Sequence, residues 1–248
     1  MTSWRRQFGD ATLPFLWVQL AAYNNSPPRA GGDALASVRA AQVDATAGLE
    51  SVAGATAIDL GDPDGSTCHG NIHPPDKQPL GYRLHLLARK LVLNETGGLF
   101  AAPLPVSCAC SAGADGGCTI EFSGPVAVSA PSACPPPDEC CTGGGGACIA
   151  SGFEVRRAGD SWQPLLTGCV ANTVGQHIAV SLRSLRSSGG GGAAAADHSG
   201  ALRVRYAHSD FPAISLHAAT AAPPDPLRAL SADRTRLPVL PFDIPCSS

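Results

Sequence analysis

A short, nearly continuous apolar run at residues 13–21 constrains the fold more than any other segment of the chain. Its length, together with its aromatic and β-branched residues, predicts a strand that is buried on both faces. Strands of this kind belong to parallel sheets that helices cover on each side. Residues 56–60 predict a second buried strand, closed by the turn residues at 61–65. The N-terminal part of the chain is therefore expected to be α/β.

Helices are expected around these strands. Residues 4–8 resemble the end of an amphipathic helix. Residues 35–47 predict a second helix with Leu35, Val38, Ala41 and Gln42 near one stripe. The leucines of Leu80–Leu93 repeat at 4-3-4 intervals and predict a third helix. Because two strands cannot form a stable parallel sheet alone, about three or more further strands are expected to precede the chain. The predicted fold is thus the C-terminal part of an α/β three-layer sandwich.

The hydrophobic pattern of the sequence changes after residue 100. Short runs alternate with period two, as half-exposed antiparallel strands do, and they predict a small antiparallel β-sandwich-like domain. The expected strands are residues 119–122, 126–128, 153–156, 177–182 and 202–206. The predicted domains are residues 1–100 and residues 101–248, the second with a Cys/Gly-rich insertion at 107–150 and a Gly/Ala-rich loop at 187–200.

Charge and hydropathy exclude several classes of partner. Charged residues make up 15% of the chain and the formal net charge is −3, without a cluster of Lys and Arg. This balance argues against a nucleic-acid partner and against a polybasic membrane contact. No apolar run reaches the roughly 18 residues of a membrane span, so no membrane span is expected. The sequence does not indicate an oligomeric state.

The chain has 10 cysteines, most of them crowded between residues 108 and 148. Such density indicates disulfides in an oxidising compartment or a metal site. The adjacent pair Cys140 and Cys141 favours disulfides, and no Cys-x-x-Cys spacing supports zinc. Disulfides, a metal site and free thiols all remain open, and the pairing cannot be predicted. The cysteines are Cys68, Cys108, Cys110, Cys118, Cys134, Cys140, Cys141, Cys148, Cys169 and Cys246.

No signal peptide is expected at the start of this chain, because Met1–Arg6 is polar and no apolar h-region follows it. Two N-glycosylation sequons nevertheless begin at Asn24 and Asn94, the first weakened by Pro27. Cysteine content and sequons favour a secreted, lysosomal or vacuolar protein. The chain is therefore expected to be a fragment of a longer glycoprotein whose start is missing.

His73 is the candidate residue for chemistry. It lies in a polar loop after the second predicted strand and before the helix at residues 80–93. Ligands of open α/β sheets bind at the carboxyl ends of the strands, where a histidine can act as a general base near neutral pH. A single loop histidine is more often a surface residue, so position alone is a weak indication.

Several segments, in the same order and with similar spacing, closely resemble sialate O-acetylesterases. They cover about half of the chain: Trp4-Arg5-Arg6-x-Phe8, residues 13–21, Ile58-Asp59-Leu60-Gly61, Ile72-His73-Pro74-x-x-Lys77, residues 81–89, residues 204–210, and Leu237-Pro238-x-x-Pro241-Phe242. The resemblance implies the C-terminal half of such an enzyme. Its fold would be the last part of an SGNH-hydrolase-like sandwich followed by a β domain. No cofactor and no metal is implied.

The resemblance implies that His73 is the base that takes the proton of a nucleophilic serine. Many bacterial members have an aspartate where this chain has Asn71, and that aspartate orients the imidazole. Asp62 and Asp64 are possible substitutes, although turn residues around Pro63 are the simpler interpretation of both.

The family's nucleophilic serine and its oxyanion-hole Gly and Asn precede the segment that this chain resembles. Gly159-Asp160-Ser161 is not a substitute, because it falls at a predicted hairpin turn of the β domain. Nucleophile motifs of this class lie between a strand and a helix of the α/β domain. The chain alone is therefore expected to be inactive, and the full-length product is expected to be a serine esterase.

The expected function is that of a carbohydrate esterase that removes O-acetyl groups from sialic acid or from other acetylated sugars, including cell-wall esters. The alternative is a non-catalytic truncated product whose β domain binds glycan or a protein partner. A gene prediction that lost upstream exons is a third interpretation. Trp162 and Tyr206 are expected to pack in the β domain, with sugar contact as the alternative.

Overall fold

The computed structural model describes residues 1–23, 34–62, 73–111, 117–128, 150–166, 170–181, 202–209, 216–219 and 236–247. The chain divides into two compact units. Unit 1 comprises Met1–Ala102, Ser209–Pro212 and Thr220–Pro238, and unit 2 comprises Pro103–His208, Ala213–Ala219 and Val239–Ser248. Two late segments of the chain thus belong to the N-terminal unit. The expected domain boundary at residue 100 stays a prediction.

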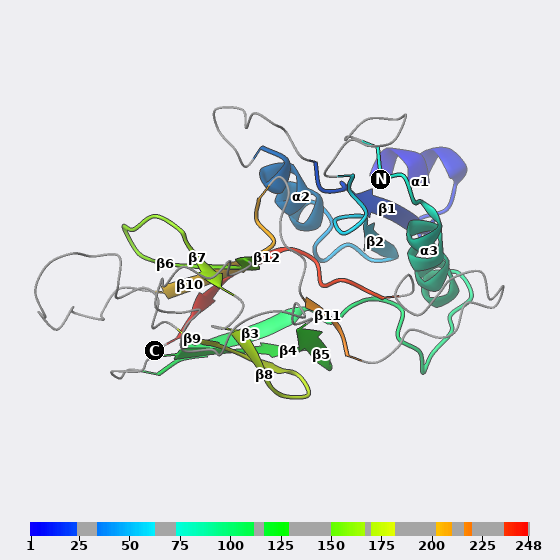
Figure 1. The fold of residues 1–248 in the computed structure, drawn as a ribbon. Coiled ribbons are helices and arrows are strands. Elements are labelled where there is room, and N and C mark those ends of the chain that lie inside the picture. The colour runs from blue at the N-terminus through cyan, green and yellow to red at the C-terminus, as the bar shows by residue number, and fades with distance from the viewer. Residues whose placement is uncertain are drawn as a thin grey trace, which may run out of the picture. The chain divides into compact units, whose positions relative to one another are not determined.

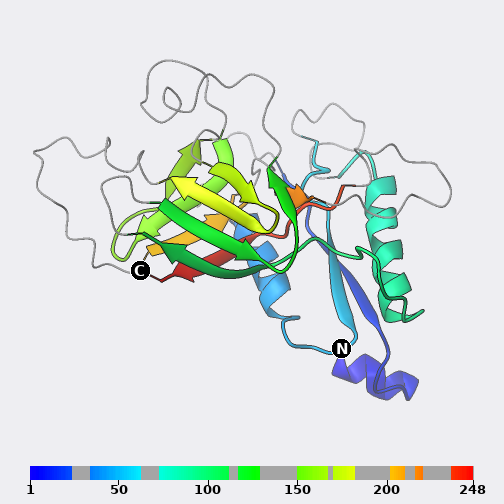
Figure 2. The ribbon, with the colours of Figure 1, turned by 90° about the horizontal axis from the view of Figure 1, so that it is seen from below.

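Unit 1 consists of a parallel strand pair and helices (Figures 1 and 2). The parallel register runs from Phe15 opposite Val52 to Gln19 opposite Thr56. This pairing agrees with the α/β interpretation of the sequence. The elements are α1 (Thr2–Phe8), β1 (Phe15–Gln19), α2 (Ala34–Asp44), β2 (Val52–Thr56) and α3 (Gln78–Leu91).

β1 is shorter than the predicted strand and is not buried on both faces. Val18 is 37% exposed and Leu20 is 40% exposed. On the edge of β1, the Gln42 side chain of α2 takes the place of a neighbouring strand. Its Nε2 donates to the Val18 carbonyl at 3.0 Å, and its Oε1 accepts from the Leu20 N–H at 3.1 Å. A polar side chain thereby satisfies backbone groups that would otherwise be unpaired.

The second strand was predicted at the wrong place. It covers Val52–Thr56 instead of residues 56–60. The Thr56 hydroxyl accepts the Ile58 N–H at 3.1 Å, and the Thr56 carbonyl accepts from Arg83 at 2.7 Å. These side-chain bonds end the strand, and the Leu60 N–H donates to the Ala57 carbonyl in the following turn. Ile58 is buried all the same, which is why the run looked like a strand.

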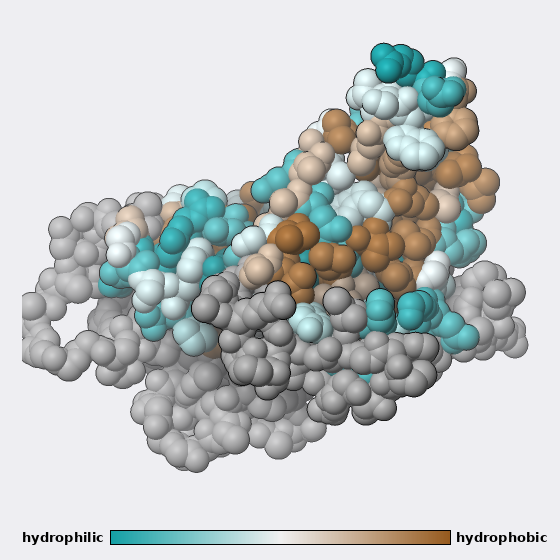
Figure 3. All heavy atoms as spheres, turned by 90° about the horizontal axis from the view of Figure 1, so that it is seen from above, coloured by the Kyte–Doolittle hydropathy of each residue, from teal (hydrophilic) through white to brown (hydrophobic). Residues whose placement is uncertain are grey.

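Large apolar side chains are exposed on unit 1. The space-filling view shows hydrophobic residues gathered on one face among the described atoms (Figure 3). The exposed ones in unit 1 include Trp4, Phe8, Val18, Leu20, Val38 and Leu49. The exposure of Val38 corrects the predicted apolar stripe of α2, because the buried residues of that helix are Ala36 and Arg39. None of the described helices has the length and hydropathy that crossing a membrane requires.

Unit 2 is built of antiparallel strands (Figure 1). One sheet has the order β12-β10-β6-β7, a second has the order β3-β4-β9-β8, and β11 pairs with β5. The strands are β3 (Pro105–Cys110), β4 (Gly117–Phe122), β5 (Val126–Val128), β6 (Ala150–Arg157), β7 (Gln163–Leu166), β8 (Val170–Val174), β9 (His177–Ser181), β10 (Leu202–Tyr206), β11 (Leu216–Ala218) and β12 (Phe242–Cys246). All five predicted strands are present, three of them with different ends.

Aromatic side chains from both four-stranded sheets form the core of unit 2. Phe153 of β6 and Tyr206 of β10 have ring centroids 4.8 Å apart, and Phe242 of β12 lies 5.8 Å from Phe122 of β4. Ser247 connects the sheets at an edge, because its N–H donates to the Cys108 carbonyl and its carbonyl accepts the Cys110 N–H. Tyr206 is thus a packed residue, as expected.

Candidate active site around His73

His73 is exposed and lies between the carboxyl end of β2 and the start of α3. α3 begins at the end of unit 1 where β1 and β2 finish (Figure 2). Both strands of a parallel pair end at the same edge, and α/β enzymes bind their ligands there. His73 precedes the helix that begins at this edge, and its position beside a substrate and its catalytic role stay predictions.

Local hydrogen bonds shape the segment from His73 to α3. The Lys77 ammonium donates to the Pro74 carbonyl at 2.7 Å, and the Asp76 carboxylate accepts the Gln78 N–H at 3.2 Å. Asp76 thus satisfies a backbone donor at the start of the helix, and Pro79 fits the first turn because it needs no N–H partner there. The sequence His73-Pro74-x-x-Lys77 therefore encodes a defined turn into α3.

Arg83 anchors α3 to the end of β2. Its guanidinium donates to both oxygens of Asp59, at 2.7 Å and 2.6 Å, and to the Thr56 carbonyl at 2.7 Å. It also reaches the Arg236 carbonyl at 3.2 Å. The buried guanidinium is thus neutralised by a bidentate carboxylate and also serves two carbonyl groups. It fixes the helix that follows His73 and the late segment of the chain that belongs to unit 1.

Arg39 anchors α2 to the end of β1, as Arg83 anchors α3 to the end of β2. Its side chain is fully buried and donates to the Leu20 and Ala21 carbonyls, each at 2.9 Å, and to the Ser209 carbonyl at 2.7 Å. The carboxyl end of β1 is therefore held by a cation from α2. Sequence reasoning missed both arginines as determinants of this edge, since nothing in the local pattern distinguishes a buried arginine from a solvated one.

The residues considered as partners of His73 are only partly described. Asn71 and Asp64 lie outside the described residues. Asp62 is described and only 5% exposed. Within the described part of the chain, no hydrogen bond joins the His73 ring to another residue. The arrangement supplies an accessible imidazole, which can act as a base once a hydroxyl nucleophile is placed beside it.

Ser161 is confirmed as a turn residue of unit 2. It follows Gly159, whose φ is 89°, in the connection between the paired strands β6 and β7. Its hydroxyl accepts a hydrogen bond from Gln163 Nε2 at 3.1 Å. The next residue, Trp162, lies against the guanidinium groups of Arg156 and Arg205, at 4.6 Å and 4.3 Å from the ring centroid. A hairpin turn of this kind is not a strand-to-helix nucleophile turn.

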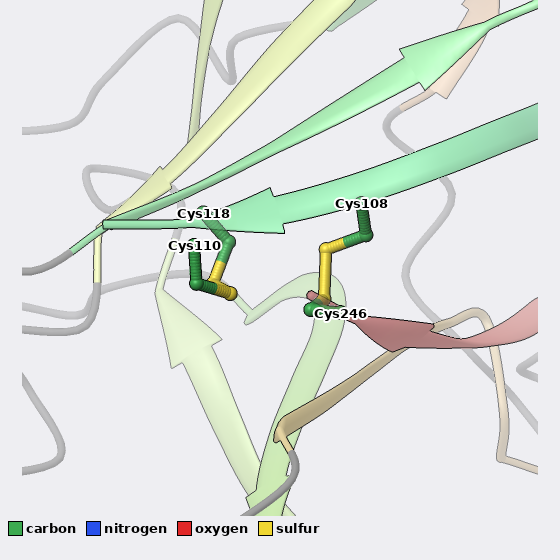
Figure 4. A group of neighbouring side chains, drawn as sticks. All are labelled: Cys108, Cys110, Cys118 and Cys246. Atoms are coloured by element: carbon green, nitrogen blue, oxygen red, sulfur yellow. A yellow bond between two sulfur atoms is a disulfide. The ribbon is translucent and has the colours of Figure 1, made fainter. Parts of the chain in front are cut away.

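Four cysteines of unit 2 are paired in the structure (Figure 4). Cys108 is joined to Cys246 with an S–S distance of 1.93 Å, and Cys110 is joined to Cys118 at 2.15 Å. Disulfides are thus possible, in line with the favoured interpretation. The remaining cysteines, Cys68, Cys134, Cys140, Cys141, Cys148 and Cys169, lie outside the described residues.

Comparison with known proteins agrees with the resemblance seen in the motifs. No family model matches the chain. Over 51 residues, which are 21% of this chain, it is 51% identical to the sialate O-acetylesterases of Homo sapiens and Mus musculus. That segment is 9% of the length of those proteins.

The fold has a counterpart among solved structures. The crystal structure of a carbohydrate acetylesterase from Xanthomonas citri matches 98% of this chain with a TM-score of 0.59 and 25% sequence identity. The chain covers 43% of that enzyme. Sequence and fold together define a carbohydrate-esterase-like chain. Within that class it is similar to the sialate O-acetylesterases.

Proposed function

We propose that the chain contributes the histidine-bearing part of an esterase that removes O-acetyl groups from sialic acid or from other acetylated sugars. The observation that carries the proposal is the 51% identity to sialate O-acetylesterases, combined with the exposure of His73 ahead of α3. An accessible imidazole at the carboxyl end of a parallel strand pair suits proton transfer to a bound substrate.

In the proposed reaction, the His73 imidazole takes the proton from a serine hydroxyl as the serine oxygen attacks the acetyl carbonyl carbon. The resulting tetrahedral intermediate expels the sugar oxygen, which receives that proton from the imidazolium. Water, deprotonated by the same imidazole, then attacks the acetyl-serine, releases acetate and restores the serine. Proton transfer by a positioned group contributes roughly 10²- to 10⁴-fold in rate.

The serine and the oxyanion-hole donors are proposed to come from residues that precede this segment in the order of the resembled family. Ser161 is a poor candidate, since it belongs to the hairpin between β6 and β7. Loss of a triad serine typically leaves only the residual catalysis of the oxyanion hole and of binding. The 248-residue chain alone is accordingly proposed to lack esterase activity.

The size of the endogenous protein is the first test. An antibody against residues 201–248 is expected to detect a species well above the 25.1 kDa of this chain. The immunopurified protein is then assayed for acetate release from an O-acetylated sialic acid and from acetylated xylan. A band at 25.1 kDa without esterase activity would instead favour the non-catalytic, glycan- or protein-binding alternative.

Genome editing of the histidine tests the mechanism. His73→Ala is expected to abolish acetate release while the amount of protein stays unchanged, because the exposed imidazole contributes nothing to the described core. His85→Ala is the matched control, since His85 is an exposed histidine on α3. Near-normal turnover in His73→Ala would remove His73 from the mechanism.

A further inference from the structure

The four paired cysteines of unit 2 form one cluster. Cys108 and Cys110 lie on β3, Cys118 lies on β4 and Cys246 ends β12. Their sulfur atoms all lie within 4.8 Å of one another (Figure 4). Cys108 is 4% exposed and Cys118 is 1% exposed. The two disulfides are therefore close neighbours, and their four sulfur atoms share a small, largely buried space.

Backbone pairing brings the four residues together. Cys108 and Cys110 are two positions apart on β3 and share a face of the strand. Cys110 lies directly opposite Cys118 in the antiparallel pair of β3 and β4. Ser247 pairs with Ala109, which brings the preceding Cys246 beside Cys108.

These contacts do not depend on the sulfur atoms. The Cys110 N–H donates to the Ser247 carbonyl at 2.7 Å, and the Ser247 N–H donates to the Cys108 carbonyl at 2.9 Å. The Ser247 hydroxyl adds a third bond to the Cys108 carbonyl at 3.2 Å. Main-chain bonds hold β3 and the end of β12 in place, so reduction of the disulfides leaves the four side chains facing one another.

We propose that this four-cysteine cluster is a redox-controlled zinc site: two disulfides when oxidised, and one tetrahedral Zn(Cys)₄ centre when reduced. Zinc–thiolate bonds of about 2.3 Å place the four sulfurs of a tetrahedron about 3.8 Å apart. A cluster confined to 4.8 Å reaches that geometry by small side-chain shifts. Four thiolates suit zinc better than harder cations, and burial protects the bound ion from water.

The exchange balances in electrons and protons. A dithiol reductant gives two electrons and two protons to each disulfide and becomes a cyclic disulfide itself. The four thiols then bind Zn²⁺ and release four protons, because thiolate is the ligand form. Two molecules of a small disulfide oxidise the four thiolates again and take up four protons from water, which yields two protein disulfides, four small thiols and free Zn²⁺.

Either state joins β3, β4 and β12, and the Cys108–Cys246 link spans a sequence separation of 138 residues. Zinc binding stabilises the folded state by mass action, since the unfolded chain does not present the four thiolates together. The site thereby keeps the C-terminal strand attached under reducing conditions as well as oxidising ones.

Cobalt(II) is the probe for the test. The complete chain is first reduced by a phosphine, which is oxidised to the phosphine oxide with an oxygen atom from water. The reduced chain is expected to bind the metal at this site with the sulfur-to-cobalt charge-transfer band and the intense visible bands of a tetrahedral thiolate site. Zinc is expected to displace the cobalt and to raise the melting temperature. The oxidised wild-type chain serves as a control and is expected to show none of these bands.

Substitutions locate the site. Cys110→Ser and Cys246→Ser are each expected to remove the four-thiolate spectrum. Cys140→Ser, which leaves Cys108, Cys110, Cys118 and Cys246 unchanged, is the matched control and should keep that spectrum. Circular dichroism of each variant before reduction checks that it is folded. The proposal is overturned if the reduced wild-type chain, with its thiols shown free by titration, binds no cobalt. It is equally overturned if folded Cys110→Ser and Cys246→Ser give the wild-type spectrum.

Discussion

Trp17 on β1 lies directly opposite Gly54 on β2, and a Cβ atom on Gly54 would stand 2.3 Å from the Trp17 indole. The indole crosses the neighbouring strand at the one position where that strand has no side chain. Gly54→Ala is therefore expected to lower the free energy of unfolding by about 1–3 kcal/mol, because the ring must leave its place. Urea unfolding followed by circular dichroism measures the change.

Gly81→Ala is the control for this prediction. Gly81 lies on the exposed side of α3, and nothing stands within 4 Å of a Cβ added there. The free energy of unfolding is expected to rise by about 0.4–1 kcal/mol, because alanine restricts the unfolded chain and favours the helix. Equal destabilisation by both substitutions would show that the Trp17 contact is not the cause.

Asp59→Asn tests the anchor of α3. The substitution leaves the buried Arg83 guanidinium without its carboxylate, and the free energy of unfolding is expected to fall by about 3 kcal/mol. Asp243→Asn provides a matched comparison, because its partner Arg203 forms an ion pair whose side chains are 36% and 34% exposed. Exposed pairs contribute about 0–1 kcal/mol, so that variant should remain near the wild type. Equal losses in the two variants would count against the anchoring role of Asp59.

Strong local periodicity predicted several elements well. The leucine repeat gave α3 to within two residues at each end, and β5 and β10 have the predicted bounds. β7 was implied by the hairpin predicted at residues 159–161, whereas β3, β8, β11 and β12 were missed. β12 contains Pro245, which local reasoning treats as a break. Tertiary pairing overrode that local preference.

The residues that hold the elements around the candidate site could not be predicted from the sequence. His73 follows from a loop between a strand and a helix, together with the motif resemblance. Arg39 and Ser209 are 170 residues apart in sequence and meet through a single hydrogen bond. The pairing of Cys108 with Cys246 likewise spans the whole β domain. Contacts of that range have no local signature, so they could not be derived from spacing.

Glu95→Gln tests a pH dependence at the end of α3. The hydrogen bond from Arg89, with the Arg89 charge, lowers the pKa of the Glu95 carboxyl. A lowered pKa in the folded state stabilises the fold above the unfolded carboxyl pKa, and the contribution is lost as pH falls through the folded pKa. The wild type is therefore expected to melt above Glu95→Gln at neutral pH, with the difference vanishing in acid. Melting curves that differ equally at both pH values would contradict this.

Tyr206→Phe tests a hydrogen bond to the tyrosine hydroxyl in the core of unit 2. The Leu216 N–H donates to that hydroxyl at 2.9 Å, and both residues are fully buried. The phenylalanine ring keeps the aromatic packing but leaves the N–H unpaired, which costs about 1–3 kcal/mol. Denaturant unfolding measures the loss. An unchanged midpoint would mean that the Leu216 N–H finds another acceptor.

Thr96→Ala tests whether the chain enters a glycosylating compartment. Asn94 and Thr96 are exposed just beyond α3, and Asn94 has a φ of 54°, a conformation that asparagine tolerates. Replacing Thr96 rather than Asn94 removes the acceptor motif without straining that backbone. In the endogenous protein, Thr96→Ala is expected to reduce the mobility shift caused by endoglycosidase, whereas Thr96→Ser, which keeps the motif, should not. A wild-type protein whose mobility is unaffected by the enzyme would argue against the secreted, lysosomal or vacuolar location that we propose.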